Sequence, residues 1–160
     1  MGINNKFDLI FDRTQADVDY ASRLKQEGLH SDSDLRGAYN SSDRNRVGGA
    51  LSMLLELLNN NGYRLVGSVR SNWAEGDIVR AKDNADIIAG LRAVRGVLPQ
   101  ISLEIPDNLD KLDWRKANAV ERILFDMYEN YDRLSDMWLW CGEGYAGYGY
   151  EEHKFDGLWV

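Results

Sequence analysis

The residue pattern closest to a ligand-binding motif lies near the end of the chain. Gly142, Gly144 and Gly147 match the G-x-G-x-x-G spacing of dinucleotide-binding loops. In such loops the glycines follow a strand and open a helix, so that the phosphates meet the helix N-terminus. Here they follow a long helical pattern and lead into a run of glycines and tyrosines. Only the spacing matches, and we expect no nucleotide cofactor.

A second candidate is a short polar cluster that could ligate a hard metal ion. His30, Asp32 and Asp34 are spaced like the start of a calcium loop, but Arg36 stands near where further ligands would be needed. The single Cys141 excludes a cysteine framework for zinc and an internal disulfide. We therefore expect neither a metal nor any other cofactor.

No arrangement of nucleophile, base and acid can be assembled from neighbouring residues. Cys141 would need His30 or His153 as its base, yet it also falls on an apolar helical seam, where cysteine acts as a small apolar residue. A glycosidase needs two carboxylates in different environments, and spacing singles out no pair among the 26 acidic residues. We expect a protein that is not an enzyme, with a cell-wall hydrolase kept as a distant alternative.

The segments around these residues are predicted to be helices whose first and last residues are marked by the sequence. Caps, glycine or proline stops and helical spacing of apolar residues predict helices near 14–28, 42–60, 77–98 and 113–141. Thr14 with Asp17 resembles a capping box, Gly28 is a natural C-cap, and Ser41 or Ser42 can cap the second helix. In the third helix, Ile78, Ala81 and Ala85 are expected to face inward with Ile88, Leu91, Val94 and Leu98. We predict a mostly α fold, a small bundle of about four helices.

Two glycines interrupt the second helix, and an extended segment follows it. Gly48 and Gly49 each cost about 1 kcal/mol inside a helix. A close approach of another helix would explain their presence. Residues 63–70 have an extended or strand-like character.

The fourth helix carries the most regular pattern in the chain. Apolar residues alternate spacings of three and four, as in the a and d positions of a heptad repeat; they are Ala117, Val120, Leu124, Met127, Tyr131, Leu134, Trp138 and Cys141. Charged residues, Glu121 among them, are assigned to its outer face. Such a seam packs either within the chain or against further copies of it.

After residue 141 the composition changes to glycine and aromatic residues. We predict a helical domain over residues 1–141 and a non-helical docking segment over 142–160. Tyr and Trp are enriched in the centres of protein interfaces. The predicted contact residues are Trp138, Trp140, Tyr145, Tyr148, Tyr150, Phe155 and Trp159.

Charge and hydropathy bear on the class of partner. Residues 101–160 hold 13 acidic and 6 basic side chains, an excess that equals the whole net charge of −7. An acidic surface repels phosphate backbones, so we expect no nucleic-acid partner. No stretch approaches the roughly 20 apolar residues of a membrane span, so no membrane insertion is expected.

Three blocks of sequence together resemble a module of tail-associated structural proteins in phages and prophages of Gram-positive bacteria. The blocks are residues 9–28 (LIFDRTQADVDYASRLKQEG), residues 37–63 (GAYNSSDRNRVGGALSMLLELLNNNGY) followed by NWAEGDI at 72–78, and residues 116–131 (KANAVERILFDMYENY) followed by GEGYAG at 142–147. They occur in the expected order. The loop after the first block is shorter than in the family, VRAKDNADI replaces a stretch richer in Pro and Thr, and the final residues have no counterpart.

The resemblance implies a non-enzymatic virion component of the tail tip, baseplate or fibre attachment, without catalytic residues to carry over. Its partners would be other virion proteins or copies of itself, and a host receptor is a further candidate. It would be present in the bacterial cytoplasm during assembly and then in the virion tail. The main alternative is a receptor- or glycan-binding module of the tail that uses an exposed aromatic residue such as Trp73 or Trp140.

Overall fold

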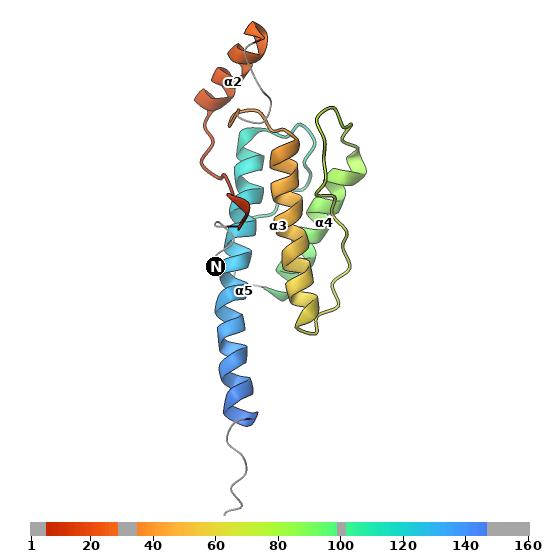
Figure 1. Cartoon of the computed structure of the whole chain (residues 1–160), viewed down its shortest axis with the longest axis vertical. Coiled ribbons are helices and arrows are strands. Elements are labelled where there is room, and N and C mark those ends of the chain that lie inside the picture. The colour runs from red at the N-terminus through yellow and green to blue at the C-terminus, as the bar shows by residue number, and fades with distance from the viewer. Residues whose placement is uncertain (1–5, 29–34, 99–101, 147–160) are drawn as a thin grey trace, which may run out of the picture. The chain divides into compact units, whose positions relative to one another are not determined.

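The computed structural model describes residues 6–28, 35–98 and 102–146, with side chains as far as Met137. Contacts divide the chain into two compact units, Met1–Asn130 and Tyr131–Val160. The first unit contains α2 (Gln15–Glu27), α3 (Ser41–Asn60), α4 (Ala81–Val97) and the beginning of α5 (Trp114–Ala146), labelled in Figure 1. No β-strand occurs among the described residues. The predicted mostly α fold with about four helices is confirmed.

The helix termini follow local side-chain chemistry. The Thr14–Asp17 capping box and the left-handed Gly28 at the end of α2 are present as predicted. Helix α3 is capped by Asn40, not by Ser41 or Ser42, because the side-chain oxygen Oδ1 of Asn40 accepts hydrogen bonds from the backbone N–H groups of Ser42 and Asp43. In return, the Asp43 carboxylate accepts the Asn40 backbone N–H at 3.0 Å.

The core consists of apolar residues from α3, α4 and α5. The two central helices, α3 and α4, pack directly on each other, and Gly90 of α4 leaves room for the side chain of Leu51 of α3. The fully buried side chains of the core include Leu51, Leu54, Leu58, Leu91, Val94, Ile123, Leu124 and Met127. The first positions of the predicted α5 seam are therefore buried within one chain.

Two predicted helix boundaries are wrong. Helix α4 begins at Ala81 instead of residue 77, Ile78 is 83% exposed, and Ala81 and Ala85 are also exposed. The stripe that contains Ile87, Leu91, Val94 and Leu98 sets the phase of the helix and turns the two alanines outward. Helix α5 continues to Ala146 and so includes residues 142–146, because glycine weakens a helix without breaking its hydrogen bonds as proline does.

Residues 63–73, which we call the strap, return along α3 in an extended conformation (Figure 1). Side chains of α3 bind its backbone. Asn59 exchanges two hydrogen bonds with Leu65 at 2.7 and 3.1 Å, Ser52 donates to the Val69 carbonyl, and Asn45 exchanges two bonds with Trp73 at 2.6 and 2.9 Å. The three side chains recur every seven residues, which places them on one face of α3.

The strap explains the glycine pair in α3. A Cβ atom on Gly48 would overlap the carbonyl oxygen of Arg70, so a side chain here is incompatible with the position of the strap. A Cβ on Gly49 would lie 2.9 Å from the ring of Phe7. At Gly48 the close approach is therefore made by the backbone of the strap, and at Gly49 by the side chain of Phe7, instead of by a long helix packed against α3.

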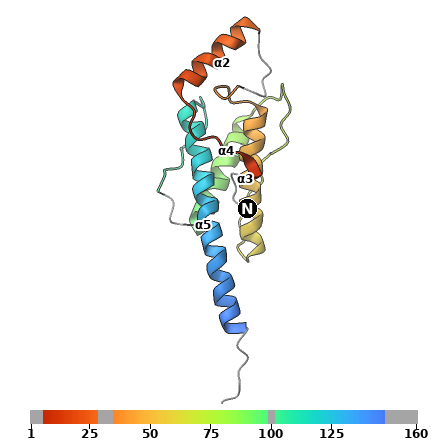
Figure 2. The same ribbon diagram turned by 60° about the vertical axis from the view of Figure 1, so that its left-hand side comes forward.

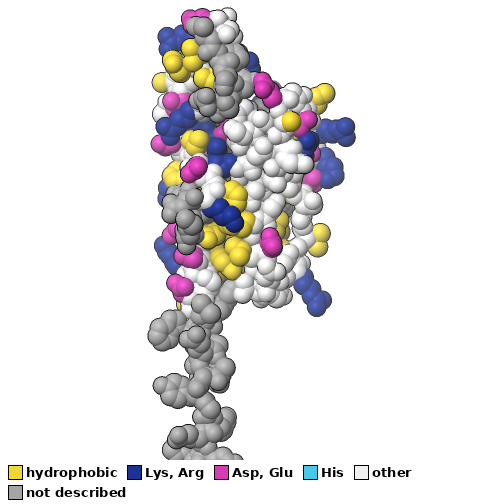
Figure 3. Space-filling view, in the orientation of Figure 1, with side chains coloured by type: hydrophobic (Ala, Val, Ile, Leu, Met, Phe, Trp, Pro, Cys, Tyr) yellow, Lys and Arg dark blue, Asp and Glu magenta, His cyan; other side chains and the backbone are white. Residues whose placement is uncertain are grey.

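The surface of the first unit mixes both signs of charge. On the face shown in Figure 3, basic and acidic side chains are interspersed, and several hydrophobic side chains gather near the middle of the view. Turning the molecule by 60° shows α3 and α4 from another side, with α5 in front (Figure 2). None of the described helices combines the length and apolar character that crossing a membrane requires. In the second unit, residues 131–146 are helical, and Met137 is 60% exposed.

Candidate functional site

The aromatic residues predicted to form a docking surface lie outside the part of the chain that the structure describes in atomic detail. Trp138, Trp140 and Tyr145 lie within α5, but the structure does not describe their side chains. Tyr148, Tyr150, Phe155 and Trp159 lie beyond the described residues. Their role in contacts stays a prediction.

The other sequence candidates divide into those that the structure places and those that it does not. Gly142 and Gly144 lie within α5, so this glycine motif does not form a phosphate loop between a strand and a helix. His30, Asp32 and Asp34 lie outside the described residues, as does the side chain of Cys141. Among the residues with described side chains, no three His, Cys, Asp or Glu residues gather as metal ligands would.

The most distinctive polar site is a buried group of four charged residues, Arg13, Asp43, Arg46 and Glu121, which we call the charge cluster. One Arg13 nitrogen donates to the Asp43 carboxylate at 2.7 Å and to Glu121 at 2.8 Å. Arg46 binds the same two carboxylates, with its Nε 2.9 Å from Glu121. Two positive and two negative charges thus alternate in one closed arrangement.

Burial makes these contacts strong and selective. The Glu121 side chain is fully buried and that of Arg13 is 2% exposed, although Glu121 is placed on the outer face by the heptad pattern. That assignment is wrong because its carboxylate turns toward the two guanidinium groups instead of toward water. Burial disfavours the Arg46 cation, but the hydrogen bonds and negative charges of Glu121 and Asp43 outweigh it and raise the pKa of Arg46.

The charge cluster also fastens the segment that precedes α2, residues 8–14, which we call the arm. The Ile10 backbone N–H donates to Glu121 at 2.6 Å, and Asn118 of α5 exchanges hydrogen bonds with the N–H and carbonyl groups of Arg13 at 3.1 and 2.8 Å. Arg13 in turn donates to the carbonyls of Ile10 and Arg36. The carboxylates are occupied by donors from the protein itself. This arrangement holds segments together and provides no uncommitted acid–base pair of the kind a hydrolase needs.

Next to the charge cluster, cationic and aromatic side chains stack in alternation. Arg13 and Arg44 lie 5.9 and 5.6 Å from the centre of the Tyr39 ring, and Arg44 and Arg70 lie 5.4 and 4.1 Å from that of Trp73. Burial first, and then the negative charge of Glu121, raises the pKa of the Tyr39 hydroxyl far above its ordinary value. The stack extends the cluster from the core toward the strap.

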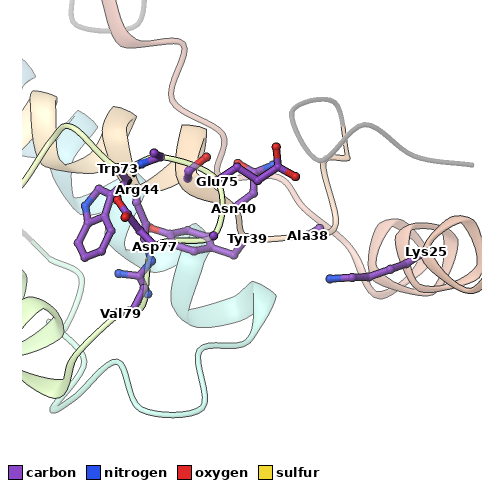
Figure 4. A pocket seen from close by; sticks show the side chains of 12 residues that line it. Lys25, Ala38, Tyr39, Asn40, Arg44, Trp73, Glu75, Asp77 and Val79 are labelled. Atoms are coloured by element: carbon purple, nitrogen blue, oxygen red, sulfur yellow. Dashed lines mark hydrogen bonds between the residues drawn. The ribbon is translucent and has the colours of Figure 1, made fainter. Parts of the chain in front are cut away.

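A pocket of about 350 Å³ opens over this stack (Figure 4). Tyr39, Arg44 and Trp73 line it, together with Glu75 and Asp77 from the following turn. Trp73 is only 6% exposed, and its indole N–H donates to the Arg70 carbonyl at 3.2 Å. A sugar-binding platform needs an open ring face, so Trp73 does not supply one for the glycan-binding alternative. The structure does not describe the Trp140 side chain.

Sequence reasoning missed both polar sites on α3. The charge cluster joins residues more than a hundred positions apart, and a pattern along one helix cannot reveal such a partner. The strap contacts did leave a signal, because Asn45, Ser52 and Asn59 repeat at heptad spacing opposite an apolar face.

Comparison with protein-family models, curated proteins and solved structures finds none that matches the chain.

Proposed function

We propose that the chain is a non-enzymatic structural protein of a phage or prophage virion, from the tail, baseplate or fibre-attachment region, which acts through protein–protein contacts. The proposal rests on the resemblance of the three sequence blocks to tail-associated modules. One structural observation supports it: each block contributes to the charge cluster. Arg13 comes from the first block, Asp43 and Arg46 from the second, and Glu121 from the third.

The charged residues of the three blocks therefore share one structural role. Their charges are satisfied by one another and by backbone groups, so they maintain a fold instead of exposing a reactive centre. Buried ion pairs of this kind can favour one arrangement of segments, since any other arrangement leaves a charge unpaired. A virion component that must present the same surface in every copy benefits from such selectivity.

Contacts with the rest of the particle are proposed to involve the aromatic residues of 138–160. Removal of residues 147–160 tests this while keeping the whole of α5. The shortened chain should keep its helical signal and thermal unfolding but no longer join the particle. If it assembles as well as the full chain, Tyr148, Tyr150, Phe155 and Trp159 are not the contact.

The class itself is tested by following the chain in the bacterium that carries its gene. After induction, particles are purified through a density gradient and analysed by mass spectrometry and by gold labelling of a tagged chain. The proposal expects the chain in the particle, with label at the tail, and incomplete tails when the gene is deleted. Its absence from purified particles, together with normal tails after deletion, would contradict the proposal.

A further inference from the structure

Arg44 is a half-buried cation on α3 that has no carboxylate partner among the described residues. Its Nη1 donates to the side-chain oxygen of Asn84 at 3.2 Å, and its guanidinium forms no other hydrogen bond within the described part of the chain. Its remaining printed contacts are with the rings of Tyr39 and Trp73, at 5.6 and 5.4 Å. The Nε–H and Nη2–H groups, which form one edge of the guanidinium, are therefore donors without an acceptor.

Arg46, two residues further along the same helix, shows what Arg44 lacks. Both side chains are partly buried, but Arg46 binds two carboxylates of the charge cluster, and these raise its pKa. Burial lowers the pKa of Arg44, and the smaller opposing effects of Tyr39 and Asp83 offset this only in part. A cation that is partly withdrawn from water without a bound anion is a site where an added anion gains free energy.

The Arg44 side chain lines the pocket of about 350 Å³ shown in Figure 4, whereas Asn84 does not line it. This volume is at the lower end of the range of small-ligand pockets. Tyr39 also lines the pocket, and its hydroxyl forms no hydrogen bond with any described residue. Ala38 and Val79 add apolar groups. Two residues with unused donors therefore border one cavity that also has apolar walls.

The charges around the pocket favour an anion with a single charge. Lys25 and Arg44 supply two positive charges, and Glu75 supplies one negative charge. Asp77 lines the pocket as well, but its carboxylate is already paired with Arg70. Beside Glu75, a singly charged carboxylate is repelled less than a phosphate group, which carries nearly two charges at neutral pH.

We propose that this pocket binds a carboxylate group, whose two oxygens accept parallel hydrogen bonds from Nε–H and Nη2–H of Arg44. This is the two-bond geometry in which a guanidinium and a carboxylate match each other. The carboxylate belongs either to a small free acid or to an Asp or Glu side chain of a peptide, and the chemistry at Arg44 is the same for both. The site is independent of the proposed virion role and of the aromatic residues near the C-terminus.

NMR of the ¹⁵N-labelled full chain tests the site at the atom concerned, at a mildly acidic pH where arginine Nε–H signals are visible. The probes are sodium benzoate and a capped Gly-Glu-Gly peptide, and the neutral controls are benzamide and the same peptide with Gln. The Nε–H signal of Arg44, identified by its loss in Arg44→Lys, should shift and saturate with at least one of the two carboxylates and with neither control. The tighter probe shows whether the source is a free acid or a peptide.

Arg115 is the matched control within the chain. It is exposed, lies 4.8 Å from the ring of Trp114 and has no carboxylate partner among the described residues, yet it does not line this pocket. Its Nε–H signal should respond only at carboxylate concentrations at least about tenfold higher. Equal responses of Arg44 and Arg115, or no response of Arg44 to either carboxylate, would overturn the proposal.

Two substitutions test the charges, with the backbone amide signals of residues 74–77 as the measure of binding. Glu75→Gln removes the like charge from an exposed position and should tighten binding of the carboxylate about two- to threefold. Arg44→Lys keeps the charge but not the paired donors and should weaken binding about tenfold or more. An amide spectrum like that of the parent shows that each variant is folded. Weaker binding by Glu75→Gln, or unchanged binding by a folded Arg44→Lys, would contradict the proposal, and Glu75→Gln decides if Arg44→Lys does not fold.

Discussion

Helix α3 holds two non-helical segments by different kinds of contact. The difference shows which contacts should contribute most to the stability of the fold. The arm is held by buried charges, which are shared among Arg13, Asp43, Arg46 and Glu121. The strap is held by neutral side chains that bind backbone groups near the surface. Losing one buried charge leaves its partners unpaired, whereas water can replace a surface hydrogen bond. The arm should therefore depend on particular residues far more than the strap does.

Replacing Glu121 should give the largest effect. Glu121→Gln leaves Arg13 and Arg46 facing Asp43 alone inside the protein, and loss of one member of a buried ion pair costs about 3–5 kcal/mol. Urea unfolding measures the change in the free energy of unfolding. The control Glu56→Gln, on an exposed position of α3, should change it by less than about 0.5 kcal/mol. Equal effects of the two substitutions would show that the charge cluster does not stabilise the fold.

Filling the space beneath the strap should have an intermediate effect. Gly48→Ala forces a methyl group into the Arg70 carbonyl, so the strap must move, at a cost of about 1–3 kcal/mol. Gly96→Ala in α4 meets no atom and should stabilise the protein by about 0.5–1 kcal/mol, because alanine favours the helix. Thermal unfolding of both variants gives the comparison. A Gly48→Ala protein as stable as the parent would mean that the strap does not lie close to α3.

Removing the α3 side chains that hold the strap should cost less. Asn59→Ala removes both bonds to Leu65, but water replaces them at this exposed position and alanine favours the helix, so the net cost should be about 1 kcal/mol. Asn45→Ala should cost somewhat more, since its two bonds reach the backbone of buried Trp73. Urea unfolding of the two variants measures how much each substitution lowers the free energy of unfolding. A loss as large as that of Glu121→Gln would remove the distinction between arm and strap.

The smallest effect concerns alkaline pH. Below a pH of about 10 Tyr39 is protonated in both states, but above it the unfolded chain loses the proton first, since burial raises the pKa in the folded protein. This contribution to stability is therefore lost as the pH rises above about 10. Tyr39→Phe cannot ionise, so its melting temperature should fall less between neutral and alkaline pH. An identical fall in both proteins would show that Tyr39 is accessible to water.

The helical class could be predicted from sequence because capping and apolar spacing are local. Thr14 and Asp17 begin α2 and Gly28 ends it, as their chemistry dictates, and the seam from Ala117 to Met127 is buried as its spacing requires. Glu121 was misplaced because its partners come from other segments. Ile78 was misplaced because an apolar residue in helical phase does not show where the helix begins. Gly48 indicated a close contact but not what makes it.

Amide hydrogen exchange, followed residue by residue in the full chain, compares the arm and the strap most directly. The N–H of Ile10, bound to Glu121, should exchange only when the protein unfolds as a whole. The N–H groups of Leu65 and Trp73 should exchange faster, through local opening of the strap. If Ile10 exchanges as fast as Leu65, the charge cluster does not hold the arm more firmly than surface hydrogen bonds hold the strap, and the account is contradicted.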